Sequence, residues 1–364
     1  MFRKVRLQLA IGALAAMLLA FCAYPARAST AVATSMDRFV LHIPSDATVL
    51  PEVLDCMLSS MDECLAFAET SLGRRLRAPI HHLWVDEAPG VLLGLCVCKH
   101  GTERHEVVHI LQKPPTSRNE VDNYASAWVH EYTHCVLYEA FGELPTLVNE
   151  GIACVVADDL LGRERHAQAA IVLAAGELPS LIALANWANQ ATRAWRFETG
   201  VNYSAAASFM SFIRDEYGRD ALISMCERMP DCRVASWGHI PKMVTAALEE
   251  TAGMSLDRLE TAWRERLDST EIDTRLKPRL VVSVRLLKHL HSSPDLDSLL
   301  FLPDLTGKNI DSFWNEFFRL HQTVVYFGMD RAGDTTEQEL REQIDELHVK
   351  AAELRLTLLY GDGE

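Results

Sequence analysis

Positive charge is scarce in this chain. Lysine and arginine together number 35, against 50 aspartates and glutamates, so the formal net charge of the 364 residues is −15. A chain with this excess of negative charge repels polyanions, so we expect no binding of nucleic acid or of an anionic membrane through bulk charge. A preference for basic substrates would require a local acidic cleft.

Long apolar runs are also missing, except near the start. Beyond residue 28 no stretch reaches the roughly eighteen uninterrupted apolar residues that a membrane-spanning helix needs, and no fixed-period repeat occurs. Residues 7–21 are apolar, follow the basic segment 3–6 and precede the small residues at 26–28, which is the order of a cleavable secretory signal. We therefore predict that residues 1–28 are removed and that the exported chain, periplasmic or secreted, is soluble.

Removal of the signal changes both charge and cysteine content. It takes away four positive charges and no negative ones, which moves the formal charge from −15 to −19. Of nine cysteines, Cys22 leaves with the signal, and bulky Phe21 beside it disfavours a lipid anchor there. The remaining even number in an exported chain favours disulfides. We expect at least two, with Cys226 and Cys232, which flank a short turn, as the favoured local pair.

Two H-E-x-x-H motifs occur, and the first to consider lies on a predicted helix. Residues 117–141 contain no proline or glycine, are apolar nearly all round, and end at Gly142. On a helix, residues i and i+4 share one face, so His130 and His134 can bind one zinc ion. Glu131 beside them is then placed to act as the general base on water.

The other copy, His105 to His109, has the composition of a strand. Its middle is Val107-Val108, and Pro114 ends the segment. Histidines four residues apart on a strand are separated by roughly 13 Å and cannot share a metal. We therefore expect strand surface or sheet packing for this copy.

A third ligand for zinc is available downstream of His134. A hydrolytic zinc site uses three protein ligands and one open position, and Glu150 in Asn149-Glu150-Gly151 can complete the set. Residues 147–153 resemble the N-E-G-x-A signature of gluzincin metallopeptidases, within the peptidase MA-like group and more distantly the zinc aminopeptidases. The likeness covers roughly residues 38–268 and is specific only at the two motifs.

The resemblance implies a site and a reaction. By this likeness His130, His134 and Glu150 are ligands of one Zn²⁺, and Glu131 is the general base of a metallopeptidase that hydrolyses peptide or protein substrates with a zinc-activated water. Related enzymes often bring a phenol or imidazole to the oxyanion, and Tyr203, at the start of a predicted helix, can fill this position. A plain core tyrosine is the alternative for Tyr203.

The chain also departs from its suggested relatives. No G-x-M-E-N segment precedes His130, and Leu147 stands where aminopeptidases usually carry tryptophan, so aminopeptidase specificity is not implied. Thermolysin-like enzymes place a carboxylate four residues after the glutamate ligand, where this chain has Cys154, so the ligand histidines must be oriented from elsewhere. Cys135 and Cys154 are interpreted as buried thiols or one disulfide, because Glu150 already completes the metal site.

The pattern along the chain predicts an α+β, zincin-like fold, with a small amino-terminal sheet, an active-site helix and a mostly helical second half. Strands are expected at 38–43, 79–85, 91–97 and 103–111. Helices are expected at 51–72, 117–141, from 146 onward, 178–189, 203–217, 219–229, 241–267 and 337–359. The expected divisions are a signal (1–28), a sheet-containing subdomain with the H-E-x-x-H helix (29–145), a helical subdomain carrying Glu150 (146–270) and a helical carboxy-terminal region (271–364).

Two questions stay open at this level. Residues 271–364 fit a small helical domain, an intramolecular lid or a surface for self-association. The rival to a peptidase is a non-catalytic exported binding or assembly module that keeps the fold and uses any zinc structurally. Glu131 argues against this rival, because a structural site needs no base. His166 and His239 are interpreted as core or surface histidines.

Overall fold

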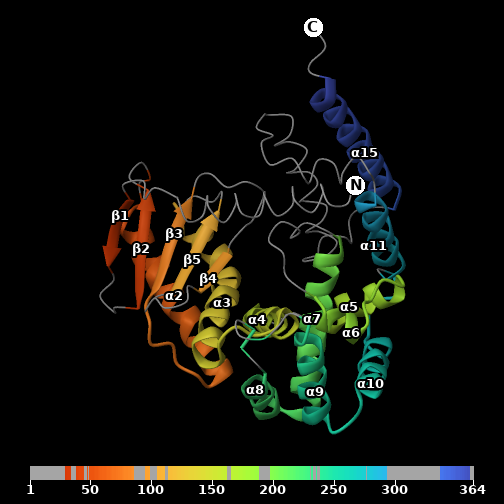
Figure 1. The fold of residues 1–364 in the computed structure, drawn as a ribbon. Helices are drawn as coiled ribbons and strands as arrows, with labels where there is room; N and C mark the ends of the chain where they lie inside the picture. The colour runs from red at the N-terminus through yellow and green to blue at the C-terminus, as the bar shows by residue number, and fades with distance from the viewer. Residues whose placement is uncertain are drawn as a thin grey trace, which may run out of the picture.

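The computed structural model shows a small sheet followed by a mostly helical chain, which confirms the α+β class (Figure 1). The predicted signal, residues 1–28, lies outside the residues that the structure describes. These are residues 29–33, 38–44, 47, 49–85, 95–98, 105–110, 114–161, 165–187, 197–229, 231–232, 235, 238–275, 277–292 and 337–360.

The sheet has five strands in the order β1-β2-β3-β5-β4. Strands β2, β3 and β5 run parallel to one another, while β1 and β4 are antiparallel edges. Strands β4 and β5, which correspond to the strands expected at 91–97 and 103–111, pair with each other, and β1 was not predicted. The strands are β1 (Ser29–Ala33), β2 (Phe39–Pro44), β3 (Ile80–Val85), β4 (Leu95–Cys98) and β5 (His105–Ile110).

Two long helices, α2 (Pro51–Leu72) and α3 (Arg118–Phe141), lie beside this sheet (Figure 1). Both have the predicted bounds to within one residue. Helix α2 ends where Gly73 adopts the left-handed conformation (φ 64°), which costs glycine little. Helix α3 begins where the Ser117 hydroxyl accepts a hydrogen bond from the Glu120 N–H at 3.4 Å.

Helix α3 is held against the sheet by polar contacts as well as by apolar packing. The Tyr132 hydroxyl and His82 Nε2 of β3 share a hydrogen bond of 2.9 Å, and both side chains are fully buried. Burial raises the pKa of Tyr132, so the phenol stays neutral. At the far end of α3, the Glu139 carboxylate accepts the N–H groups of Arg77 and Ala78. These contacts fix the rotation of α3 about its axis.

The described residues of the second half are mostly helical. Three expected helices have different bounds, and a further helix at 277–291 had no expected counterpart. The helix expected over 178–189 spans only Leu181–Ala185, because the Ser180 side chain caps its start and the chain leaves the helix at Asn186. The helix expected over 241–267 is two helices, divided where Gly253 takes a φ of 64°. The remaining difference is the start of α7, which begins at Phe197. The helices are α4 (Thr146–Leu161), α5 (Arg165–Ala174), α6 (Leu181–Ala185), α7 (Phe197–Tyr217), α8 (Arg219–Arg228), α9 (Ile240–Ala252), α10 (Leu256–Asp268), α11 (Lys277–His291) and α15 (Glu337–Tyr360).

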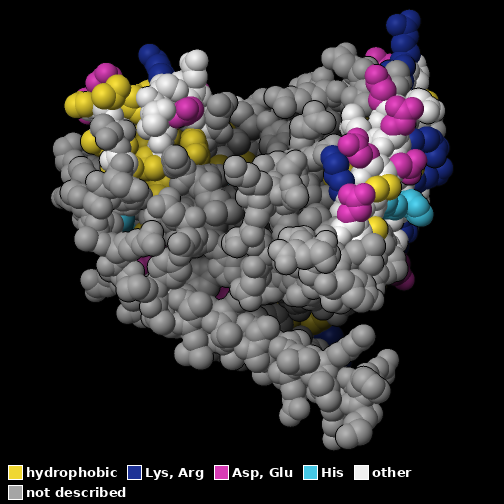
Figure 2. Space-filling model, turned by 90° about the horizontal axis from the view of Figure 1, so that it is seen from above, with side chains coloured by type: hydrophobic (Ala, Val, Ile, Leu, Met, Phe, Trp, Pro, Cys, Tyr) yellow, Lys and Arg dark blue, Asp and Glu magenta, His cyan; other side chains and the backbone are white. Residues whose placement is uncertain are grey.

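Helix α11 ties the carboxy-terminal region to the helical half. Its His291 Nδ1 accepts the N–H of Phe197 at 3.2 Å, at the start of α7, and Lys288 forms an ion pair with Glu177. Helix α15 packs on α11 through a buried stripe that includes Ile344 and Leu347. Seen from above, the side of the molecule where α11 and α15 lie carries charges of both signs, interspersed (Figure 2). Among the described residues, none of the helices has the length and hydrophobicity to cross a bilayer.

The cysteines differ from the prediction. Cys56, Cys64, Cys135, Cys154, Cys226 and Cys232 are free thiols. Cys226 is buried in the core on α8 with 1 % exposure, while the backbone N–H of Cys232 donates to the Glu143 carbonyl, and both thiols are free. The predicted Cys226–Cys232 disulfide is therefore wrong. With these thiols free, two disulfides within the chain cannot form, so that prediction is also wrong.

Alkylation of unreduced protein tests this thiol state. We expect at least six modified cysteines after denaturation. In the folded protein Cys226 and Cys64 should react slowly, because burial raises the pKa of each thiol to about 12 and only the thiolate is a good nucleophile. Mass spectrometry after alkylation, with and without prior reduction, measures the count. A mass shift that appears only after reduction, on the peptides carrying Cys226 and Cys232, would restore the disulfide.

Candidate metal centre

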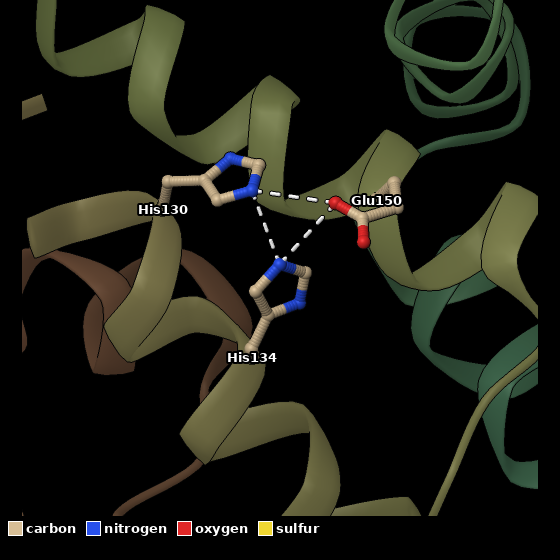
Figure 3. A group of neighbouring side chains, drawn as sticks. All are labelled: His130, His134 and Glu150. Atoms are coloured by element: carbon tan, nitrogen blue, oxygen red, sulfur yellow. Dashed lines mark hydrogen bonds and ion pairs between the residues drawn. The ribbon is translucent and has the colours of Figure 1, made fainter. Parts of the chain in front are cut away.

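Three side chains from two neighbouring helices converge at one point (Figure 3). His130 and His134 project from consecutive turns of α3, and Glu150 projects from the first turns of α4. The short segment between the helices, which includes Gly142 and Pro145, reverses the chain so that α4 packs on α3. The three predicted ligands are thus brought together.

The donor atoms form a triangle of the size that zinc requires. His130 Nε2 and His134 Nε2 are 3.1 Å apart, and each lies 3.4 Å from Glu150 Oε2. Tetrahedral ligands at about 2.0–2.1 Å from zinc are separated from one another by roughly 3.3–3.4 Å. Among the described residues these three form the one group of histidine, cysteine or acidic side chains close enough together to hold a metal ion. The donor set therefore fits Zn²⁺ in number, chemistry and spacing.

The charges at this point favour a cation. Burial alone would raise the pKa of Glu150, but His134 and His130 outweigh it and hold that pKa well below its usual range. Burial likewise lowers the pKa of His134, yet Glu150, with smaller contributions from Glu131 and Asn149, raises it to about 10. Glu150 is thus an ionised carboxylate with only 7 % exposure. A buried carboxylate needs positive charge beside it, which protonated His134 provides without a metal and a metal ion would provide when bound.

The opposite nitrogens of both imidazoles also have partners. His134 Nδ1 donates to Asn149 Oδ1 at 3.0 Å, and His130 Nδ1 lies 3.8 Å from Cys154 Sγ. A hydrogen bond at Nδ1 leaves the Nε2 lone pair directed at the metal position. The role of Asn149 in orienting His134 was not predicted, and the one feature of the sequence that pointed to it is its position beside Glu150. The group that orients His130 was expected elsewhere in the chain, but Cys154 itself contacts His130 Nδ1.

Gly151 explains how α4 comes close enough to its other neighbour, α7. A Cβ atom added at Gly151 would lie 2.8 Å from the backbone oxygen of Ala206 and 2.5 Å from Met210 Cγ. A backbone oxygen cannot move aside as a flexible side chain can, so only glycine fits here without a shift of α4. The glycine of the N-E-G segment is therefore required by the packing that places Glu150.

Of the two predicted catalytic residues, Glu131 is near the metal ligands. It is half-buried, and its charge contributes to the raised pKa of His134. Tyr203 does not begin a helix, contrary to the prediction, because α7 starts at Phe197. Its half-buried ring packs edge-on against Trp187, with the two ring centroids 5.2 Å apart. By helical spacing it shares a face of α7 with Ala206, which contacts α4, and its part in catalysis stays a prediction.

The remaining predicted histidines lie away from this centre. His105 is on β5, is 5 % exposed, and its Nε2 lies 3.3 Å from Glu139 Oε2, which confirms sheet packing for the second H-E-x-x-H copy. The side chain of His109 is outside the described residues. His166 is a core histidine whose Nδ1 contacts the Ser208 hydroxyl at 3.0 Å, and exposed His239 precedes α9.

No protein-family model, no curated protein and no solved structure matches this chain. The assignment of the site consequently rests on its own geometry and charge, and on the motif resemblance described above.

Metal content measured on variants tests which motif binds. We expect about one zinc per chain in the wild type, and loss of it in His130→Ala and Glu150→Ala, because two ligands hold zinc far more weakly than three. His105→Ala removes a histidine of the other motif and should retain the metal. Elemental analysis of protein dialysed against a weak chelator gives the count. If Glu150→Ala kept its zinc and His105→Ala lost it, the metal would be bound by the motif at 105–109 and not by the motif at 130–134.

Gly151→Ala tests the packing of α4 against α7. The added methyl group should destabilise metal-free protein by about 1–3 kcal/mol, as overpacking does. It should also weaken zinc binding by roughly tenfold or more, because a shift of α4 displaces a ligand atom. Gly238→Ala is the matched control, since a Cβ there meets nothing within 4 Å. Urea unfolding and zinc competition titrations measure the two effects, and equal behaviour of the two variants would contradict the account.

Proposed function

We propose that this protein is an exported zinc metallopeptidase of the gluzincin type, with a zincin-like fold. One observation carries the proposal: His130, His134 and Glu150 place three donor atoms 3.1–3.4 Å apart, with Glu131 next in the chain to the first ligand. Three protein ligands leave one position of a tetrahedral ion open, which distinguishes a catalytic from a structural zinc site. The peptide substrate class comes from the motif resemblance.

In this proposal each residue of the site has a defined role. A bound zinc would supply a Lewis acid that polarises the substrate carbonyl and lowers the pKa of water. The Glu131 carboxylate accepts the proton of the attacking water and delivers it to the nitrogen of the leaving amine. Asn149 and Cys154 keep the two imidazoles in the tautomer that binds through Nε2. The Tyr203 hydroxyl donates to the oxyanion of the tetrahedral intermediate.

The non-catalytic alternative is less well supported by the surroundings of the site. Structural zinc sites are closed by four protein ligands, whereas the described residues supply three. Cys154 contacts the Nδ1 side of His130, on the far side of the ring from Glu150, so it does not complete a closed set. A binding or assembly module would also have no use for a half-exposed carboxylate at Glu131.

Glu131→Gln separates the two functions. The substitution keeps the shape of the side chain and all three ligands, but the amide cannot accept a proton. Peptide hydrolysis should fall by roughly 10²–10⁴-fold with zinc content unchanged. Asp122→Asn, on an exposed position of the same helix, is the control and should leave turnover unaltered. Full turnover in Glu131→Gln, measured on a quenched-fluorescent peptide library, would refute the assigned base.

Tyr203→Phe tests the oxyanion donor. Because the hydroxyl would act mainly in the transition state, turnover should fall by about a hundredfold while KM, zinc content and melting temperature change little. A core tyrosine predicts the reverse, with turnover intact and about 1 kcal/mol of stability lost. Tyr217→Phe, at the end of the same helix, controls for loss of a phenol. Near-normal turnover in Tyr203→Phe would remove it from the site.

A further inference from the structure

A cavity lies behind α4, the helix that carries Glu150. It has a volume of about 330 Å³ and is bounded by α2, α4, α7 and α8. On α4 it contacts Ile152, Val156 and Asp159, which lie on the opposite side of the helix from Glu150. The cavity is therefore separate from the metal centre. Its size falls at the lower end of the range for small-molecule sites, roughly 300–1,000 Å³.

The inner wall of this cavity is apolar. Aliphatic and aromatic side chains come from α2, α4 and α8, and they include Phe67, Leu72, Ile152, Val156, Leu222 and Ile223. At about 30 Å³ for each water-sized group, the volume holds roughly eleven non-hydrogen atoms. A chain of about eight carbons with a small polar head has this size.

Among the residues that the structure describes, one cation of the cavity lining has no ion-pair partner. Arg214 forms ion pairs with Asp159 and with Asp215, which lies outside the lining, so Arg214 and Asp159 leave no net positive charge. The third charged lining residue, Arg219, has no ion pair with any other described residue, and its side chain is exposed. A Cβ added at Gly73 would lie 2.1 Å from Arg219 Nη2, so the guanidinium lies over the end of α2 at the cavity. Ser71 of α2 adds a hydroxyl to the same lining.

An apolar wall with one free guanidinium matches an amphipathic monoanion. We propose that this cavity binds a medium-chain aliphatic carboxylate, with its chain among Phe67, Val156 and Leu222 and its carboxylate paired with Arg219. Arginine presents parallel N–H groups that fit a carboxylate in a bidentate manner, and such bonds are about twice as strong as those between neutral groups. The proposal does not depend on the chemistry of the metal centre.

Isothermal titration of the full-length, zinc-loaded protein with octanoate tests the proposal. We expect one site with a dissociation constant below roughly 5 mM. Octanamide has the same length and no charge, so it should bind at least about tenfold more weakly. A dissociation constant for octanoate above roughly 5 mM, or equal affinity for octanoate and octanamide, would overturn the proposal.

Variants at the rim assign the carboxylate contact. Arg219→Gln should weaken the binding of octanoate by about tenfold or more and leave the binding of octanamide unchanged. Arg219→Lys keeps the charge, so it should recover much of the lost octanoate affinity. Arg258→Gln, an exposed arginine of α10 away from the cavity, is the matched control and should bind as the wild type does. Melting temperatures of the variants verify that the fold is kept. If Arg219→Gln and Arg258→Gln lost the same octanoate affinity, the net charge of the protein and not this cavity would account for the binding.

Discussion

The close approach of α4 to its neighbours is the constraint on which the metal centre depends. On one side α4 meets α7 at Gly151, where no Cβ atom fits against the Ala206 backbone oxygen. On the other side it meets α3, whose rotation is set by the buried hydrogen bond between Tyr132 and His82. If either contact relaxed, Glu150 would move relative to the two imidazoles. The geometry of the site is therefore a consequence of core packing and not of the ligands alone, because packed interiors transmit small shifts.

The same packing buries charged groups that a metal ion would stabilise. Glu150 is an ionised carboxylate in the interior, and the two Nε2 atoms face each other at 3.1 Å. Burying such groups is costly without a partner, and two imidazole nitrogens can share at most one proton between them. A divalent cation would satisfy all three donors at once, so its binding would contribute directly to the stability of the folded state. The hydrogen bonds of Asn149 and Cys154 prepare both rings for this state in advance.

Local signals predicted much of this architecture, and long-range contacts account for what was missed. The bounds of α2 follow from Pro51 and Gly73. The two H-E-x-x-H copies could be told apart because one contains β-branched residues typical of a strand and the other lies in an unbroken helical pattern. Spacing along the chain cannot show that His134 is oriented by Asn149, nor that Gly151 faces a backbone oxygen of α7. The disulfide prediction failed for the same reason: an even count of cysteines says nothing about the direction in which Cys226 points. The division at Gly253 was missed because the apolar spacing continued across it.

X-ray absorption at the zinc edge is the most direct measurement of the central claim, that His130, His134 and Glu150 hold a zinc ion with one open position. On the purified, zinc-containing protein the account predicts nitrogen and oxygen scatterers alone, at about 2.0–2.1 Å, with the multiple-scattering signature of two imidazoles. A sulfur scatterer at about 2.3 Å would contradict it, because the zinc would then be bound by a cysteine such as Cys154 in a closed, structural site.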